Sequence, residues 1–415
     1  MTEIEYQKAV NWLFEQAPNY QIDGQKAYKP GLDNIKSLCE IFGNPQDKIK
    51  SVHIAGTNGK GSVSNMVASI LQEAGYTIGL YNSPHLVDFT ERIKINGENC
   101  SREFVYQFIQ KLKQLPDRIK PSFFEFTTIM AFEYFYQNKV DFAIIETGLG
   151  GRLDSTNIIT PQVSAITNVD LDHMNILGNS IEEIAHEKAG IIKKNVPIIS
   201  GDERGEVKAI IRNKAQQESS PFIDASTTET YYSSDLKGNY QVKNIKVAVA
   251  IINELRKQNI IIEDEHIEAG LLNVQKNTGF IGRWSMISEE PKIICDTAHN
   301  QAGLTAVFDQ LNALPEHKHI VLGFVNDKNI DEVLKILPQN AHYYFVKPAI
   351  HRGRDPKTYD EELKKTKIFY KIFNSVWEGY LSAFQNLKSG EMIFIGGSNF
   401  VVGEFLEKKF GDINI

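Results

Sequence analysis

The chain has 415 residues, of which 42% are hydrophobic and 23% are charged, and its formal net charge at pH 7 is −7. This length predicts two domains, and the composition is that of an ordinary globular protein. The negative charge argues against a nucleic-acid-binding protein, which usually carries a basic excess. The three cysteines, Cys39, Cys100 and Cys295, lie far apart without a CxxC pair, which argues against a disulfide framework and against a zinc site.

The first predicted element is an amphipathic helix at residues 1–17, MTEIEYQKAVNWLFEQA. Its acidic start differs from a signal peptide, which begins with basic residues before an apolar core. The sequence contains no run of 18 apolar residues, so we expect no membrane span. A reducing cytoplasm is the expected location.

Short apolar runs then alternate with helical patterns. Strands are predicted at residues 51–56, 77–83, 140–148 and 163–170, and helices at 62–75, 124–138, 180–193 and 237–255. Ser180 and Glu183 form the capping pattern that marks a helix start. This alternation is typical of a mostly parallel sheet with crossover helices.

A polar, proline-containing segment, SEEPK (288–292), predicts a domain boundary, with one domain at residues 1–288 and a second at 289–415. After it, strands are predicted at 292–299, 318–324, 341–348 and 391–398, and a helix at 300–314. The second domain therefore continues the α/β alternation.

The segment HIAGTNGKGSV (53–63) predicts a phosphate-binding loop between a strand and a helix. Such a turn directs backbone N–H groups and the positive helix end toward a phosphate. Lys60 can place a charge on the terminal phosphates, and Ser62 can offer a hydroxyl to Mg²⁺. The spacing differs from GxxxxGK[ST], because Gly56 is only three residues before Gly59. The alternative is a glycine-rich turn with an exposed lysine.

Two acidic residues follow the next buried strand, in DFAIIETGLGGRLDSTNI (141–158). Glu146 ends the strand, where ligands bind in open α/β sheets, and a carboxylate there suits Mg²⁺. Asp154 lies in the glycine-rich continuation. For both, the alternative is a solvated acid in a loop.

His173 follows a third strand, in TNVDLDHMNILG (167–178), and is either a metal ligand or a buried, hydrogen-bonded histidine. Lys188 lies among apolar neighbours on the following helix. If it faces inward, burial lowers its pKa, which permits covalent modification.

The last third offers a weaker pattern, IICDTAHNQAG (293–303), in which a strand precedes Asp-x-x-His. Asp296 can bind a ribose hydroxyl and His299 a phosphate or base, or else Asp296 caps a helix. Arg283 lies before the predicted boundary and can contact phosphate or form a surface ion pair.

Together these segments resemble the Mur ligase superfamily and, within it, the folylpolyglutamate synthase/dihydrofolate synthase family. Residues 56–62 (GTNGKGS) look like the family's variant ATP loop, and residues 82–97, 148–157, 170–178 and 187–193 match further signatures in order. DTAHN (296–300) is similar to the C-terminal motif, with Thr297 where glycine is common. The resemblance covers nearly the whole chain.

The resemblance implies a fold and a reaction. The fold is α/β, with a P-loop-containing, mostly parallel sheet ATPase domain followed by a smaller Rossmann-like domain that closes on glutamate and ATP. The reaction is ATP-dependent: a carboxylate of dihydropteroate or of a folate becomes an acyl phosphate, and the amine of L-glutamate attacks it. This places the chain in folate biosynthesis, one-carbon metabolism and polyglutamylation. ATP and two Mg²⁺ ions are the implied cofactors.

The resemblance also implies roles for individual residues. The catalytic residues would be Lys60, His173 and Lys188, the last as a carbamylated lysine. ATP would contact Thr57, Asn58, Gly59, Lys60, Gly61, Ser62, Asn244, Arg283, Asp296 and His299. Mg²⁺ would be bound by Ser83, Glu146, His173 and carbamylated Lys188. The pterin would be bound by Tyr28, Lys29, Ser122, Phe123, Phe124, Glu125, Leu153, Asp154 and Ser155.

Two alternative functions remain open. One is a related Mur-type ligase that joins a different acid and amino acid. The other is a nucleotide switch without chemistry, which the extra metal candidates Glu146, His173 and Lys188 disfavour. The expected partners are small-molecule substrates, without nucleic acid or membrane, and the expected oligomeric state is a monomer.

Overall fold

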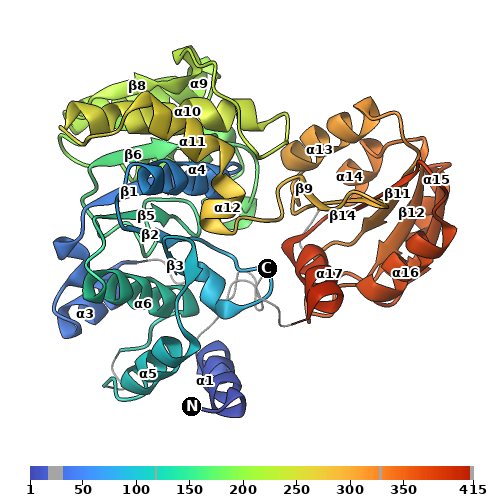
Figure 1. Ribbon diagram of the computed structural model, residues 1–415, viewed down its shortest axis with the longest axis horizontal. Helices are drawn as coiled ribbons and strands as arrows, with labels where there is room; N and C mark the ends of the chain where they lie inside the picture. The colour runs from blue at the N-terminus through green and yellow to red at the C-terminus, as the bar shows by residue number, and fades with distance from the viewer. Residues whose placement is uncertain (17–30, 117–118, 327–329, 412–415) are drawn as a thin grey trace. The chain divides into compact units, whose positions relative to one another are not determined.

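The chain divides into two compact units, each with its own sheet (Figure 1). The computed structural model describes residues 1–16, 31–116, 119–326 and 330–411. Unit 1 comprises Met1–Asp235 and Gln241–Phe280, and unit 2 comprises Leu236–Tyr240 and Ile281–Ile415. The segment 288–292, predicted to link two domains, instead connects two antiparallel strands of unit 2. The division therefore lies at Phe280, because the chain enters the second sheet before that segment.

Unit 1 is built on an eight-stranded sheet of order β4-β3-β2-β5-β1-β6-β7-β8. The six strands β2, β5, β1, β6, β7 and β8 are parallel to one another. At the β2 edge, β3 and β4 extend the sheet as antiparallel strands. The central strands are buried along their whole length, as expected for a parallel sheet covered on both faces. The strands are β1 (Ser51–Ala55), β2 (Ile78–Tyr81), β3 (Ile93–Ile95), β4 (Glu98–Asn99), β5 (Phe142–Glu146), β6 (Val163–Ile166), β7 (Ile198–Ser200) and β8 (Phe222–Asp224).

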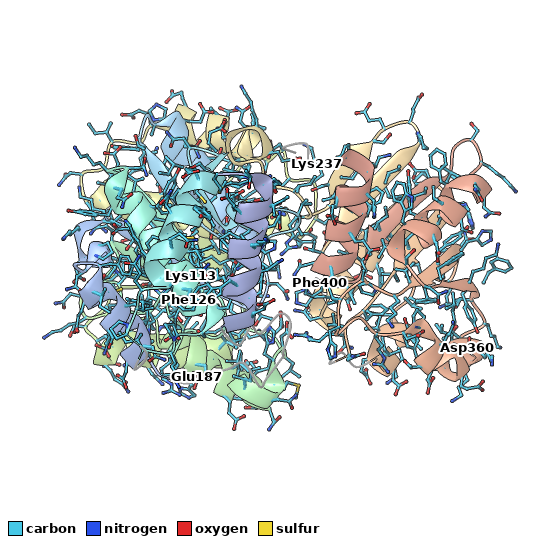
Figure 2. The ribbon with its side chains drawn as sticks, turned by 90° about the horizontal axis from the view of Figure 1, so that it is seen from below. Lys113, Phe126, Glu187, Lys237, Asp360 and Phe400 are labelled. Carbon is cyan, nitrogen blue, oxygen red and sulfur yellow. The ribbon has the colours of Figure 1, made fainter. Side chains whose placement is uncertain are left out.

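Helices cover both faces of this sheet (Figure 1). On one face, α4 packs beside α10 and α11. On the other, α1, α3, α5 and α6 enclose an aromatic-rich core. Lys113, which follows α5, and Phe126 of α6 are labelled in Figure 2, and both approach the Trp12 ring of α1, at 5.1 Å and 6.4 Å from its centroid. The helices are α1 (Glu3–Gln16), α3 (Asp33–Ile41), α4 (Lys60–Glu73), α5 (Arg102–Leu112), α6 (Phe123–Gln137), α7 (Met174–Leu177), α8 (Ile181–Ala189), α9 (Gly205–Gln217), α10 (Gln241–Lys257), α11 (Asp264–Leu272) and α12 (Val274–Thr278).

Unit 2 has a six-stranded sheet of order β13-β12-β11-β14-β10-β9, parallel except for β9. Its strands are β9 (Ser285–Ser288), β10 (Lys292–Asp296), β11 (Lys318–Leu322), β12 (Ala341–Val346), β13 (Phe369–Phe373) and β14 (Met392–Gly396). Its helices are α13 (Gln301–Ala313), α14 (Ile330–Lys335), α15 (Asp360–Lys365), α16 (Val376–Asn386) and α17 (Asn399–Phe410).

The predicted fold class is confirmed: both units are α/β, and the larger one carries the glycine-rich loop. The predicted strands and helices are present with ends shifted by a few residues. The loop helix, for instance, begins at Lys60 rather than Ser62. None of the described helices combines the length and the apolar character that a membrane crossing requires.

Candidate active site

The candidate residues of unit 1 gather at the carboxyl edge of its sheet. Strands β2, β5, β1, β6 and β7 are consecutive neighbours and parallel, so their carboxyl ends share one edge. Ser83 follows β2, Glu146 ends β5, the loop 56–59 follows β1 and His173 follows β6. This is the edge at which open α/β sheets bind ligands.

The glycine-rich loop turns directly into α4. Gly59 has a φ of +86° and caps the helix in the left-handed region, which favours glycine. Lys60, the first helical residue, donates from Nζ to the carbonyl oxygens of Gly56 at 3.0 Å and Thr57 at 3.4 Å. Its ammonium therefore lies over the loop, at the positive end of α4, which is suited to an anion.

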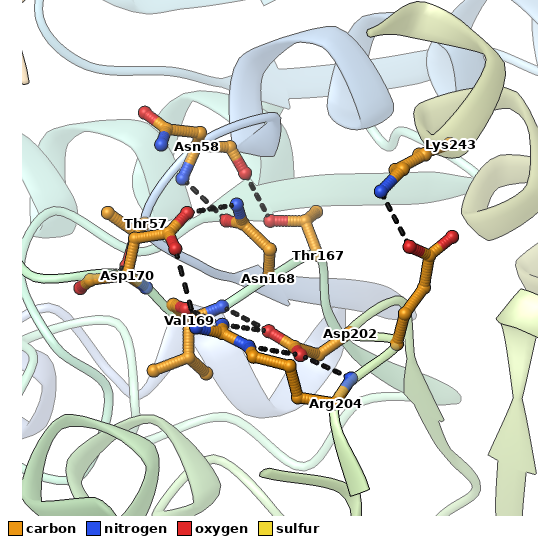
Figure 3. Close-up of polar contacts among 10 residues, drawn as sticks. Thr57, Asn58, Thr167, Asn168, Val169, Asp170, Asp202, Arg204 and Lys243 are labelled. Carbon is orange, nitrogen blue, oxygen red and sulfur yellow. Dashed lines mark hydrogen bonds and ion pairs between the residues drawn. The ribbon is translucent and has the colours of Figure 1, made fainter. Parts of the chain in front are cut away.

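The segment after β6 supports the loop from below (Figure 3). Thr57 N donates to Asn168 O at 3.0 Å, and Asn58 N donates to Asn168 Oδ1 at 2.7 Å. Asp170 N donates to Thr57 Oγ1 at 2.9 Å, and Thr167 Oγ1 donates to Asn58 O at 2.5 Å. Hydrogen bonds from Thr167, Asn168 and Asp170 to Thr57 and Asn58 therefore fix the conformation of the loop.

An ion pair after β7, between Asp202 and Arg204, fixes the segment after β6 that contacts the loop (Figure 3). Arg204 binds Asp202 in a bidentate manner, with Nε to Oδ1 at 2.9 Å and Nη2 to Oδ2 at 2.6 Å. Asp202 Oδ2 also accepts from Val169 N at 2.9 Å, and Arg204 Nη1 lies 3.6 Å from Asp170 Oδ1. Burial raises the pKa of Asp202, but the hydrogen bonds from Arg204 and the backbone outweigh it and lower that pKa overall.

Helix α10 contributes two amides beside the loop. Gln241 donates from Nε2 to Ser62 Oγ at 3.2 Å, and its Oε1 accepts from Asn244 Nδ2 at 2.7 Å. A Cβ at Gly59 would collide with Asn244 Oδ1, so the Asn244 side chain lies directly on the loop. Ser62, predicted to face Mg²⁺, is 1% exposed and carries this hydrogen bond, which leaves one lone pair for a cation.

Glu146 lies beside the same loop. Its side chain is 4% exposed, and Oε2 accepts from Asn82 Nδ2 at 2.7 Å. Asn65 Nδ2 donates to Asn82 Oδ1 at 3.2 Å and to Gly61 O at 2.7 Å. A Cβ at Gly61 would lie 3.7 Å from Glu146 Oε2. This carboxylate, with the oxygens of Ser62 and Ser83 in neighbouring segments, is an oxygen donor set of the kind that Mg²⁺ prefers.

Lys188 is an inward-facing lysine, as expected. It is 3% exposed in the last turn of α8, and among the described residues no group accepts a hydrogen bond or ion pair from its Nζ. Burial and the nearby Lys60 ammonium lower the pKa of Lys188 to about 7, although Asp172, Asp170 and Asp154 oppose the shift. Half of these side chains therefore carry a neutral, nucleophilic amine at that pH.

His173 lies at the start of α7 with a φ of +50°, in the left-handed region. Its Nε2 is 3.9 Å from Asp172 Oδ2, and about a quarter of its side chain is exposed. Asp172 is also one of the carboxylates that act on Lys188. The two predicted ligands of a second metal ion, His173 and Lys188, thus have a carboxylate in common.

Among those predicted pterin residues that the structure describes, Phe124 is the one that is both aromatic and partly exposed. Its ring packs against Gly148, where a Cβ would come within 2.5 Å, and lies 5.8 Å from the Tyr81 ring. Phe123, by contrast, is 3% exposed and stacks on Phe14 at 4.7 Å between ring centroids. Phe123 therefore belongs to the core.

Three further pterin candidates have local structural roles. Ser122 and Glu125 form the reciprocal capping box of α6, with Ser122 N donating to Glu125 Oε2 at 2.6 Å. Asp154 accepts from Leu149 N at 2.8 Å and from Thr156 N at 3.0 Å, and burial raises its pKa. Leu153 and Ser155 beside it are partly exposed. Tyr28 and Lys29 lie outside the described residues.

In unit 2, Asp296 ends β10 and is 2% exposed. Its carboxylate accepts from Tyr240 OH at 2.6 Å and from Trp284 N at 2.8 Å, and burial raises its pKa. The cap of the following helix is Asn300, which accepts from Gly303 N at 2.9 Å, so Asp296 is not a helix cap.

Arg283 and His299 lie on the segments that flank Asp296. Arg283 Nη1 donates to Gly282 O at 3.1 Å, and the charge of Arg283 lowers the pKa of Asp296 against the effect of burial. His299 Nδ1 is 3.0 Å from Thr297 O, so Nδ1 carries the proton. Arg283 and Asp296 therefore interact, with His299 three positions along the chain.

Four residues that hold the site together were not predicted from the sequence. Asn168 and Asp170 contact the loop directly, and Asp202 and Arg204 contact the segment that contains them. The motif TNVDLDHMNILG contains the first two, but only its histidine carries a recognisable metal-ligand pattern. For Asp202 and Arg204, the sequence offers one local sign of an ion pair: an aspartate stands two residues before an arginine, just after a strand.

Two family models match separate parts of the chain, and solved structures match nearly all of it. The Mur ligase middle domain matches residues 54–252, and the Mur ligase, glutamate ligase domain matches residues 282–399. The chain is 35% identical to the dihydrofolate synthase/folylpolyglutamate synthase of Bacillus subtilis, over 97% of this chain and 99% of that one.

Two solved structures resemble the fold closely. E. coli FolC in complex with DHPP and ADP gives a TM-score of 0.84 at 27% identity, over 97% of each chain. The bifunctional folylpolyglutamate synthase/dihydrofolate synthase of Yersinia pestis, complexed with AMPPNP and Mn ion, gives a TM-score of 0.84 at 26% identity. The latter match covers 97% of this chain and 98% of that chain.

Proposed function

The chain belongs to the dihydrofolate synthase/folylpolyglutamate synthase family of ATP-dependent ligases, and we propose how its own residues carry the reaction. The reaction joins L-glutamate to dihydropteroate or a folate by an amide bond. The observation that carries the proposal is the position of Lys60 and Glu146. Lys60 places a cation at the amino end of a helix, and the Glu146 carboxylate, an oxygen ligand, lies beside the same loop.

The first step is phosphoryl transfer from ATP. A carboxylate oxygen of the acid substrate attacks the γ-phosphorus, and the bond to the ADP oxygen breaks. Lys60, the loop N–H groups and the amino end of α4 neutralise charge on the transferred group, because positioning and electrostatics supply most of this catalysis. The Asn244 side chain of α10 lies against the loop, where it would orient the nucleotide.

In the second step, the amine of glutamate attacks the acyl carbon, phosphate leaves and the amine loses a proton. No side-chain nucleophile takes part in either step. The active site therefore has to align two substrates and stabilise negative charge.

ATP and a divalent cation are the cofactors, and we propose two Mg²⁺ ions. The first would be held by Glu146, Ser83 and Ser62, and the second by His173 and a modified Lys188. Mg²⁺ supplies charge neutralisation and orientation of the phosphates. The donors are mainly oxygen atoms, which agrees with this choice of metal.

We propose that Lys188 is carbamylated. Its neutral amine would attack CO₂, lose a proton and become a carbamate anion. Support comes from the burial of the amine and the absence of an acceptor for it among the described residues. A carbamate would replace an unpaired ammonium beside Lys60 with an anion. Trapping of ¹³CO₂ followed by ¹³C NMR tests this independently of activity.

We propose that the pterin ring packs on Phe124, between Gly148 and the segment 153–155. Asp296 and Arg283, which interact in unit 2, would contact ATP, with His299 beside them. The cytoplasm and a monomeric state, both predicted from the sequence, are part of the proposal.

Purified full-length protein should release phosphate from ATP only when glutamate and dihydropteroate or tetrahydrofolate are both present. Omitting either substrate should reduce the rate to background. Turnover with another acid and amino acid, but not with these, would instead favour a different Mur-type ligase. Comparing dihydropteroate with tetrahydrofolate shows whether one or both activities are present.

A further inference from the structure

Three histidines meet on one face of the sheet in unit 2. His317 directly precedes β11, His319 lies in β11 and His342 lies in β12. Side chains two residues apart on a strand share a face, which places His317 and His319 together. His319 and His342 are paired in register, so the third histidine joins them.

The imidazole nitrogens are close enough to share a cation. One nitrogen of each histidine lies within 4.8 Å of the other two. Two nitrogens bound to one tetrahedral Zn²⁺ at about 2.0–2.1 Å are about 3.3 Å apart. Small side-chain rotations would therefore close the site. The rings are inclined at 79° to 89° to one another, so they meet edge to face and none of the three pairs is stacked.

His317 offers a nitrogen without a hydrogen-bond partner among the described residues, whereas a metal on His319 would replace one of that residue's two hydrogen bonds. His317 Nε2 is buried and has no hydrogen-bond partner among the described residues. His319 is 1% exposed, with Nδ1 at 2.9 Å from Tyr344 OH and Nε2 at 2.9 Å from Glu391 Oε2. When one of these nitrogens ligates a metal, the other remains an N–H donor, which is the usual arrangement around metal-bound imidazole.

The cluster is separate from the candidate ATP contacts of the same unit. Glu391 precedes β14, so the four side chains lie at the amino ends of the parallel strands β11, β12 and β14. Asp296 ends β10, which is parallel to β14. Its carboxylate therefore lies at the opposite edge of the sheet.

We propose that His317, His319 and His342 form a site for a divalent transition-metal cation of the zinc class, with Glu391 as a carboxylate beside it. Imidazole suits Zn²⁺, whereas Mg²⁺ prefers oxygen, so the site does not compete for the cation of the ATP site. The spacing of the cysteines disfavours a cysteine zinc site, whereas these three histidines come from two strand segments that become neighbours only in the folded sheet.

The test measures Zn²⁺ binding to the full chain, without a histidine tag and with excess Mg²⁺, by isothermal titration calorimetry. Wild-type protein should bind one Zn²⁺ per chain. His317→Gln and His342→Gln should each weaken binding about 10- to 100-fold or more, since the loss of even an outer partner has this effect. Both histidines are partly exposed, so these variants should fold, which matching circular dichroism and Tm without metal would verify.

The matched control is His351→Gln, because His351 is an exposed histidine of the same unit outside the cluster. This variant should bind Zn²⁺ as wild type does. Co²⁺ in place of Zn²⁺ should give the visible absorption of a four-coordinate site in wild type and His351→Gln only. Failure of the wild type to bind, or equal binding by all four proteins, would overturn the proposal and leave the cluster a packing arrangement.

Discussion

At the scale of single residues, replacing Lys60 should affect catalysis but not thermal stability. Its ammonium contacts loop carbonyls rather than the core, so Lys60→Ala should leave Tm nearly unchanged. The kcat should fall about 10²- to 10³-fold, the usual effect of removing one stabilising donor at a developing charge. Steady-state kinetics and thermal unfolding measure both quantities. Lys111→Ala, an exposed lysine on α5, should change neither; a large loss of Tm in Lys60→Ala would contradict this assignment.

The lowered pKa of Lys188 predicts that carbamate formation and ligase activity depend on pH. Its pKa of about 7 means that the neutral amine, which alone reacts with CO₂, increases as the pH rises from 6 to 8. The carbamate signal in ¹³CO₂-saturated buffer should therefore rise through about pH 7, and ligase activity should follow it. Lys188→Ala should lose both, and acetate or formate should partly restore its activity. A flat carbamate signal across this range would contradict the prediction.

Two adjacent phenylalanines should behave differently. Phe123→Ala removes a ring from the core and should cost about 3–5 kcal/mol of unfolding free energy. Phe124→Ala should mainly raise the KM for dihydropteroate or folate, with little change in the KM for ATP. Urea unfolding and two-substrate kinetics distinguish the two variants. An unchanged pterin KM in Phe124→Ala would exclude ring packing at that position.

At the scale of secondary-structure elements, the ion pair after β7 is bound to the segment after β6, and that segment in turn contacts the loop after β1. Asp202 has a lowered pKa, so its carboxylate stabilises the fold above the unfolded value of about 3.8. That contribution is lost as the pH falls through the lower, folded value. Asp202→Asn should therefore cost about 1.5–3 kcal/mol at pH 7, as for hydrogen bonds to a charged group, and much less near pH 3.

The Asp202→Asn variant should also raise the KM for ATP, because Asp202 holds Val169 beneath the loop. Urea unfolding at several pH values and ATP kinetics provide the measurements. Lys243→Ala, which breaks an exposed ion pair with Glu203, is the matched control and should cost little at any pH. A pH-independent difference between wild type and Asp202→Asn would show that the carboxylate charge is not what stabilises the loop.

At the scale of the whole molecule, the sequence predicted those features that local patterns encode. The glycine-rich loop, Glu146 at a strand end and the inward face of Lys188 each follow from a strand or helix pattern of a few residues. The contact of Gln241 with Ser62 and the ion pair of Arg204 with Asp202 depend on which strands are neighbours. Strand order is set by packing across the sheet, and the printed sequence contains no local sign of it.

The division of the chain at Phe280 and the meeting of the three histidines could not be predicted from the sequence for the same reason. SEEPK has the composition of a linker, but the strands on either side of it pair, which makes it a connection within one sheet. His317, His319 and His342 become neighbours only through the register of β11 and β12. Both are consequences of strand pairing between distant residues.

The acyl phosphate is the central chemical claim, and transfer of an oxygen isotope tests it most directly. Dihydropteroate or folate labelled with ¹⁸O in the reacting carboxylate is turned over with ATP and glutamate, and the phosphate is analysed by mass spectrometry. One carboxylate oxygen should leave with each phosphate, because that oxygen attacks phosphorus before the amine displaces it. Phosphate without ¹⁸O, formed together with the amide product, would contradict the mechanism.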